Sequence, residues 1–128
     1  MIYAVSDLHG RYDRYRQLLD KLDLGEQDTL YVLGDALDRG PEGFQILSDM
    51  ASRPQVVGLL GNHEAMALDA LPGLLGSLEN SRASMSRSDR ANASLWFSNG
   101  GESSLRDFLR LDKGQRQEVW ACLLYTSP

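Results

Sequence analysis

Three short apolar segments alternate with segments of helical pattern in the first part of the chain. The apolar segments are residues 2–5, 30–33 and 56–60, and each is followed by glycine or polar residues. Segments of this length are typical of strands that are buried on both faces of a sheet. We therefore predict three strands.

The segments between these strands place apolar residues three or four positions apart, which is the spacing of a helix. Residues 12–22 show this pattern, and Gly25 follows as a stop signal. Pro41 is suited to the first turn of a second helix. The inward positions of that helix would be Ile46, Leu47 and Met50.

A third helix is predicted over residues 64–71, where Pro72 would end it. The resulting order of strand and helix implies a parallel sheet with crossover helices, so we predict an α/β fold. After this unit, serine and arginine dominate residues 77–94, a composition that predicts an exposed connection.

The last part of the chain contains a second segment that we expect to be ordered. Trp96 and Phe97 begin it, and Gly100-Gly101 marks a tight turn. A helix should follow, with Ser103 or Ser104 as its N-cap. Its inward face would carry Leu105, Phe108 and Leu109.

Composition and charge narrow the class of protein. The chain has 128 residues, 42% hydrophobic and 24% charged, which suits a single globular domain. A net charge of −5 argues against a nucleic-acid or membrane partner. No apolar run approaches the roughly 18 residues of a membrane span, and no leader precedes Ile2. We therefore predict a cytoplasmic protein.

Polar residues suited to metal binding follow each predicted strand. Asp7 and His9 follow the first strand, Asp35 the second and Asn62 the third. Ligands of parallel sheets bind at the carboxyl ends of the strands, so we expect these side chains to meet. Imidazole combined with oxygen donors suits manganese, iron or zinc better than calcium.

Three motifs at these positions resemble the metallophosphoesterase signature. They are Asp7-x-His9-Gly10, Gly34-Asp35-x-x-Asp38-Arg39-Gly40 and Gly61-Asn62-His63-Glu64. The glutamate after the histidine and the Asp-Arg-Gly sequence are similar to those of serine/threonine phosphoprotein phosphatases. The resemblance implies a metallophosphoesterase β-sandwich flanked by helices, truncated after its first β-α-β-α-β half.

The resemblance also implies a dinuclear metal centre. Asp7 and His9 would bind the first ion, Asp35 would bridge the two ions, and Asn62 would bind the second. The cofactors would be two divalent metal ions, manganese first, with iron or zinc as alternatives. Two such ions can polarise a phosphoryl group and activate a water molecule.

Three further residues carry catalytic roles by the same resemblance. His63 would be the general acid, oriented by Asp38, and Arg39 would bind the phosphate. These roles agree with general chemistry, since a nearby carboxylate favours a protonated histidine and the arginine fork matches phosphate oxygens. Substrate contacts would come from Arg39, Asn62 and His63.

The chain departs from the family pattern in its second half. His9 and His63 are its only histidines, whereas the family has further histidine ligands later in the sequence. We therefore expect residues 1–121 to be a partial catalytic domain that is inactive by itself. Residues 122–128 translate back to the mosaic end of a sequencing adapter, which predicts a non-native tail.

These observations predict a metal-dependent phosphoesterase of the serine/threonine phosphatase type. Its substrate would be a phosphorylated protein or a small phosphoester. One alternative is a symmetrical dinucleoside tetraphosphatase, a group that usually has aspartate where this chain has Glu64. The other alternative, from a different class, is a catalytically incomplete fragment that binds phosphate without hydrolysing it.

Overall fold

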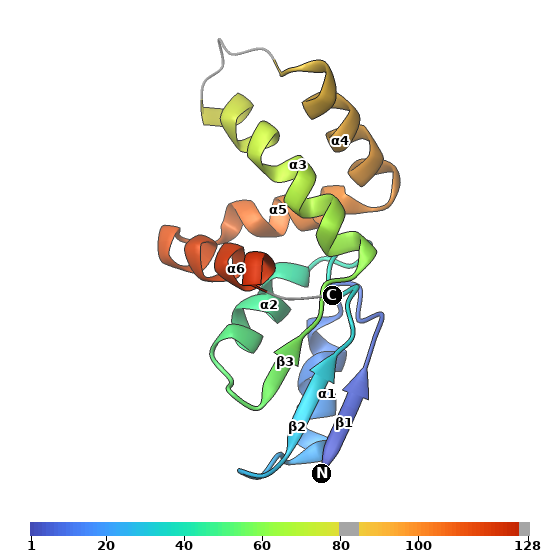
Figure 1. The fold of residues 1–128 in the computed structure, drawn as a ribbon, viewed down its shortest axis with the longest axis vertical. Helices are drawn as coiled ribbons and strands as arrows, with labels where there is room; N and C mark the ends of the chain where they lie inside the picture. The colour runs from blue at the N-terminus through green and yellow to red at the C-terminus, as the bar shows by residue number, and fades with distance from the viewer. Residues whose placement is uncertain (80–84, 126–128) are drawn as a thin grey trace.

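The computed structural model describes residues 1–79 and 85–125, which form a three-stranded sheet and six helices (Figure 1). The order of these elements confirms the α/β class and the alternation of strand and helix. Their bounds are β1 Ile2–Val5, α1 Tyr12–Leu22, β2 Thr29–Val32, α2 Gly43–Ala51, β3 Val56–Gly58, α3 Asn62–Glu79, α4 Arg87–Ser98, α5 Gly101–Arg110 and α6 Lys113–Tyr125.

The sheet is parallel, with the strand order β1-β2-β3. Its register places Ala4 beside Tyr31, and Tyr31 beside Val57. One face is buried against α1 and α2 because strand residues such as Leu30 and Val32 share a core cluster with residues of both helices. Ile46, Leu47 and Met50 of α2 are buried there, as the sequence predicts.

The opposite face of the sheet is open, which corrects the prediction that the strands are buried on both faces. Burial alternates along β1 and β2 because successive side chains point to opposite faces. Ile2 is 74% exposed, Leu33 is 48% exposed and Val57 is 38% exposed. Among the described residues, helices therefore cover one face of the sheet and leave apolar side chains on the other.

The prediction that Pro72 ends the third helix is wrong. Helix α3 continues through this residue to Glu79. A proline inside a helix costs about 3 kcal/mol, but the residues just before it pack tightly, since Ala67, Ala70 and Leu71 are almost inaccessible to solvent. Packing of this face against neighbouring helices offsets the cost of the proline.

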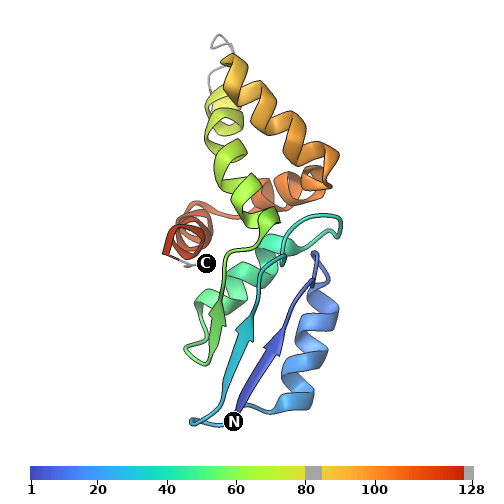
Figure 2. The same cartoon turned by 45° about the vertical axis from the view of Figure 1, so that its right-hand side comes forward.

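The prediction of an exposed connection over residues 77–94 is also wrong for the residues that the structure describes. Helix α4 begins at Arg87. Ser86 is its N-cap, and the Ser86 hydroxyl accepts a hydrogen bond from the Asp89 amide. Ala93 is buried, and α4 packs along α3 to form a helical pair that extends away from the sheet (Figure 2). The central part of the predicted connection, residues 80–84, lies outside the described residues.

The predicted tight turn is confirmed at Gly100, which has a φ of 92°. This glycine is the N-cap of α5, so the expected cap at Ser103 or Ser104 is wrong. Phe108 of α5 is buried as predicted, whereas Leu109 is 42% exposed.

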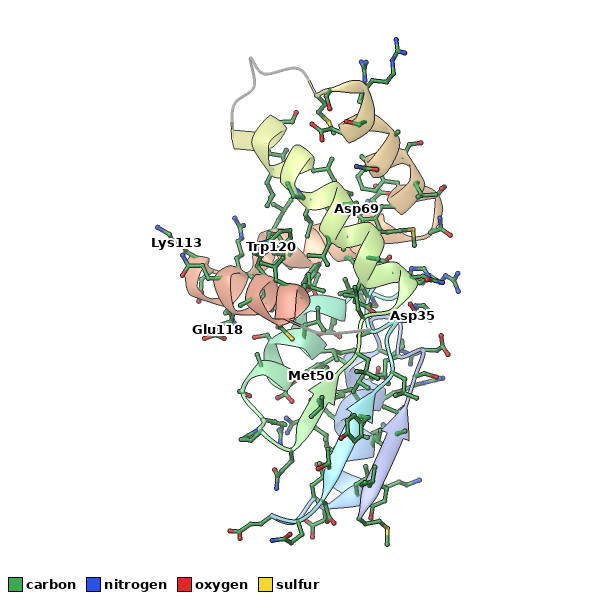
Figure 3. The ribbon with its side chains drawn as sticks, in the orientation of Figure 1. Asp35, Met50, Asp69, Lys113, Glu118 and Trp120 are labelled. Atoms are coloured by element: carbon green, nitrogen blue, oxygen red, sulfur yellow. The ribbon has the colours of Figure 1, made fainter. Side chains whose placement is uncertain are left out.

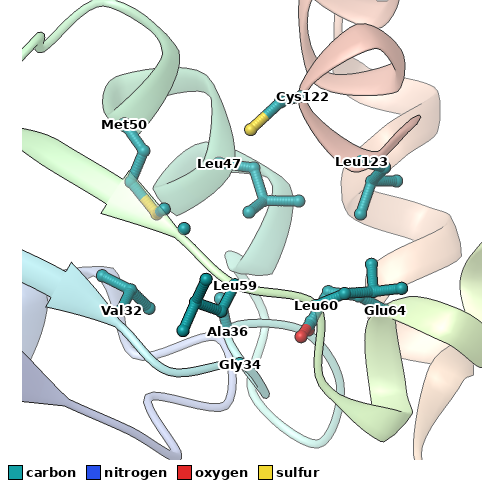
Figure 4. Close-up of a pocket in the computed structure, with 11 residues that line it drawn as sticks. Val32, Gly34, Ala36, Leu47, Met50, Leu59, Leu60, Glu64, Cys122 and Leu123 are labelled. Carbon is teal, nitrogen blue, oxygen red and sulfur yellow. The ribbon is translucent and has the colours of Figure 1, made fainter. Parts of the chain in front are cut away.

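Helix α6 extends to Tyr125, four residues into the predicted tail of residues 122–128. Leu123 is 2% exposed, and Cys122 and Leu123 line a small cavity with Leu47 and Met50 (Figure 4). The helical continuation does not test the origin of the predicted tail, and residues 126–128 lie outside the described residues. Within residues 1–79 and 85–125, no helix has the length and hydropathy needed to cross a membrane.

Candidate active site

The loops that follow β1 and β2 are joined by backbone hydrogen bonds. The amide of His9 donates to the carbonyl of Asp35 at 3.0 Å, and the amide of Gly10 donates to the carbonyl of Ala36 at 2.8 Å. Glycine permits this approach, since a Cβ at Gly10 would lie 2.4 Å from the carbonyl oxygen of Gly40. The carboxyl ends of the strands therefore bring the sequence motifs together.

Five residues of these loops have left-handed backbone conformations although none is glycine. The φ angles are 58° at Asp7, 42° at His9, 58° at Asp35, 75° at Asp38 and 72° at Arg39. Such conformations cost about 1–3 kcal/mol each and concentrate at functional sites. All five are among the residues that the sequence selects as candidates.

Asp7, His9 and Asp35 form a group with the donor atoms of a metal site. One ligand atom from each residue lies within 4.8 Å of the others. Figure 3 shows Asp35 where the end of the sheet meets the first turn of α3. His9 Nδ1 lies 2.9 Å from the carbonyl oxygen of Leu37, so an Nδ1–H can donate there. That tautomer leaves Nε2 free for a metal ion, which is the usual arrangement of a ligating histidine.

Asn62 is brought to the same edge of the sheet as the first residue of α3. Its side chain is exposed. The backbone N–H of the next residue, His63, donates to Asp35 Oδ1 at 3.2 Å. This bond ties the start of α3, where Asn62 lies, to the Asp35 carboxylate.

His63 and Asp38 form a buried pair beside the Asp7–His9–Asp35 group, called the metal group below because its donor atoms suit a metal ion. His63 Nδ1 lies 2.8 Å from Asp38 Oδ2, and the side chain of Asp38 is inaccessible to solvent. The ring of His63 contacts the ring of His9 edge to face, with centroids 4.8 Å apart. The predicted general acid therefore lies against a predicted metal ligand.

Burial raises the pKa of Asp38, and hydrogen bonds involving Ser104, His63 and Trp96 act in the opposite direction. Trp96 Nε1 donates to Asp38 Oδ2 at 2.8 Å and to Oδ1 at 2.9 Å. The sequence predicts only that Trp96 begins an ordered segment, and the structure buries its indole fully. The sequence carries no signal that its indole N–H reaches Asp38, 58 residues away.

Arg39 lies next to this pair with an exposed side chain. Its backbone amide donates to the carbonyl of Gly100 at 3.0 Å. Its guanidinium forms no ion pair with any residue in the described ranges 1–79 and 85–125. The fork of Arg39 is therefore available for an anionic ligand at the same sheet edge.

Glu64 is a second residue whose role the sequence does not reveal. Its buried carboxylate accepts hydrogen bonds from the amides of Asp35 at 2.6 Å, Leu37 at 3.1 Å and Gly61 at 3.0 Å. Burial raises the pKa of Glu64, while these three amides oppose that effect. Glu64 thus ties the second and third motifs together through hydrogen bonds to their backbone amides.

Known proteins share this sequence pattern. Residues 1–122 match the family model described as calcineurin-like phosphoesterase. The chain is 30% identical over 124 residues to Serine/threonine-protein phosphatase 2 of Escherichia coli, which covers 96% of this chain and 47% of that protein. It is 39% identical over 75 residues to a symmetrical bis(5'-nucleosyl)-tetraphosphatase of Delftia acidovorans, which covers 57% of this chain and 27% of that protein.

Among the similar solved structures is the crystal structure of a provisionally assigned diadenosine tetraphosphatase, with 25% identity and a TM-score of 0.49. The match covers 71% of this chain and 40% of that chain. The chain thus spans less than half the length of the curated relatives and of the solved structure named here.

Proposed function

Since the chain belongs to the calcineurin-like phosphoesterase family, we propose that it contributes the amino-terminal part of a phosphomonoesterase of the serine/threonine phosphatase type. The proposal includes two divalent metal ions, with manganese as the first candidate and iron or zinc as alternatives. The observation that carries it is the meeting of the Asp7, His9 and Asp35 ligand atoms beside the His63–Asp38 pair.

The donor set fits divalent metal ions. Asp7 and Asp35 supply carboxylate oxygens, and His9 supplies Nε2 because its Nδ1 faces the Leu37 carbonyl. Asn62 adds a neutral oxygen from the first residue of α3. When bound, the ions would polarise the phosphoryl group and generate the attacking hydroxide from water near neutral pH.

His63 would give a proton to the leaving oxygen of the substrate. Its Nδ1 is engaged by Asp38, so Nε2 is the atom that would carry the proton to the alkoxide. Asp38 remains fully buried and stabilises the imidazolium by charge and by hydrogen bonding. Arg39 would bind two phosphate oxygens through its planar fork and orient the ester.

A symmetrical dinucleoside tetraphosphatase is the second candidate because several similar proteins carry that name. The residue after His63 is a weak guide to the choice, since Glu64 bonds to backbone amides. The match to phosphatase 2 covers 96% of this chain, whereas the matches to these three tetraphosphatases cover 57%, 75% and 69%. This difference favours the phosphomonoesterase proposal.

The experiment that tests the proposal uses the product of the source gene, read past the codon of Ala121. The purified product is assayed with manganese on a phosphoserine peptide, on p-nitrophenyl phosphate and on diadenosine tetraphosphate. Metal-dependent release of phosphate from the monoesters, lost in His63→Ala, supports the proposal. Hydrolysis confined to the dinucleotide would assign the second candidate instead.

Sequencing the same gene also tests the origin of the tail. A gene that continues with Cys-Leu-Leu-Tyr after Ala121 would refute the hypothesis of a non-native tail.

A further inference from the structure

The segment of residues 96–104 makes three separate hydrogen-bonded contacts with Asp38 and Arg39. We propose that this 96–104 segment positions the acid pair, with Trp96 and Ser104 as positioning residues for His63. The inference rests on the proposed function for the role of His63, but its geometry is independent of any metal or substrate. The segment joins α4 to α5, so it lies outside the three sequence motifs.

Trp96 acts on the carboxylate of Asp38. Its indole N–H donates to both oxygens, at 2.8 and 2.9 Å. The same Oδ2 faces His63 Nδ1 at 2.8 Å. Because the indole is fully buried, it fixes the plane of the carboxylate relative to the imidazole ring. A fixed carboxylate favours the tautomer with a proton on Nδ1, which leaves Nε2 directed away from Asp38.

Ser104 and Gly100 act on the backbone of the same loop. The amide of Asp38 donates to Ser104 Oγ at 2.8 Å, and the amide of Arg39 donates to the Gly100 carbonyl at 3.0 Å. Asp38 and Arg39 have φ angles of 75° and 72°, which residues other than glycine rarely adopt. Hydrogen bonds from outside the loop stabilise this unusual backbone.

Close packing shows that the segment has little freedom to adopt another position. A Cβ at Gly101 would lie 2.4 Å from the ring of Trp96, so the backbone there is in contact with the indole. A Cβ at Gly100 would lie 2.8 Å from Arg39 Cγ. Ser104 is also inaccessible to solvent. The Trp96 indole, the Ser104 hydroxyl and the Gly100 carbonyl therefore belong to one closely packed segment, which holds all three against the loop of Asp38 and Arg39.

The test measures the tautomer of His63 by nitrogen-15 NMR of the full chain, under conditions in which the imidazole is neutral. The chain has two histidines, so a His9→Gln sample assigns the signals. Trp96→Phe keeps an aromatic ring but removes the N–H. We expect it to reduce the ratio of the Nδ1–H to the Nε2–H tautomer about fivefold, as for the loss of one hydrogen bond. The matched control is Trp120→Phe, which should leave the ratio unchanged.

A folded Trp96→Phe variant with the wild-type tautomer ratio would overturn the proposal. If that variant does not fold, Ser104→Ala decides the matter through amide hydrogen exchange. We expect faster exchange at the Asp38 amide in Ser104→Ala and no change in Ser98→Ala, whose hydroxyl contacts Leu95 on α4. Equal exchange in the two serine variants would contradict the inference. Because no metal or substrate is present, these results are independent of whether the chain hydrolyses phosphoesters.

Discussion

The imidazole of His63 and the carboxylate of Asp38 meet at 2.8 Å in a position where Asp38 has no access to solvent. The two residues belong to different motifs, since His63 lies in the first turn of α3 and Asp38 lies in the loop after β2. The pair contacts the Asp7–His9–Asp35 group through the ring of His9 and through the backbone amide of His63, which donates to Asp35 Oδ1 at 3.2 Å. The carboxylate of Asp38 bonds instead to His63 and Trp96. Proton transfer and metal binding are therefore expected to respond to different substitutions.

The first prediction concerns Asp38→Asn. This change removes the charge that supports protonated His63 but leaves Asp7, His9 and Asp35 in place. We expect the metal content to stay unchanged while turnover falls by about 10²-fold or more and its pH dependence changes. Metal analysis and a pH–rate profile of the active gene product check this. Loss of metal from the variant would mean that Asp38 is a ligand.

The second prediction concerns Asp35→Asn. An amide carries no charge to offset the repulsion between two cations, so metal-dependent hydrolysis should be abolished and manganese affinity should fall about tenfold or more. Calorimetric titration with manganese measures the affinity. Asp69→Asn, an exposed position on α3, provides the matched control. Near-normal turnover of Asp35→Asn with metal would contradict the bridging role.

The third prediction concerns the 128-residue chain itself. It has two histidines, both already assigned, so each ion would have few protein ligands. We expect at most about one weakly bound divalent ion per chain and negligible hydrolysis of p-nitrophenyl phosphate with manganese. Equilibrium dialysis and a phosphatase assay measure the two quantities. Robust turnover that His63→Ala abolishes would show that other residues of this chain complete the site.

The fourth prediction concerns acid stability and Asp49, which links α1 to α2. Burial disfavours its charge, but the Arg53 guanidinium at 2.7 Å and the Tyr15 hydroxyl at 2.7 Å outweigh burial and lower the pKa of Asp49 below its ordinary 3.8. A lowered pKa in the folded state stabilises the protein above about pH 4, and this stabilisation is lost as the pH falls through the folded-state pKa.

Urea unfolding at about pH 6 and about pH 3 tests this linkage. The free energy of unfolding should fall more on acidification in the wild type than in Asp49→Asn. Asp20→Asn, an exposed carboxylate on α1, should behave like the wild type. If the free energy of unfolding fell equally on acidification in the wild type and in Asp49→Asn, Asp49 would not be the cause of the acid sensitivity.

The fifth prediction concerns the open face of the sheet. Ile2, Leu33 and Val57 expose apolar surface there, which favours binding of hydrophobic dyes and self-association. Leu33→Lys should lower the fluorescence of bound anilinonaphthalene sulfonate by about twofold and slow aggregation. Leu95→Lys alters a side chain that is 55% exposed on α4, and it should have a smaller effect. Equal effects of the two variants would exclude the sheet face as the source.

The sequence by itself determined the parallel α/β arrangement and selected three candidate ligand residues whose donor atoms the structure brings together. Short apolar runs ended by polar loops are local patterns, and the carboxyl ends of parallel strands must share one edge. Asp7, His9 and Asp35 could therefore be selected from their places after two strands, and the structure brings their ligand atoms within 4.8 Å.

Only the tertiary structure decided the features that depend on contacts between distant segments. The length of α3 depends on packing that offsets the cost of Pro72, and the roles of Trp96 and Glu64 depend on which groups their side chains reach. A buried tryptophan has the same sequence pattern whether its N–H bonds to a nearby carbonyl or to a carboxylate 58 residues away. Local periodicity specifies which face of a helix is apolar, whereas the partner of a buried polar atom is fixed only when the whole chain has packed.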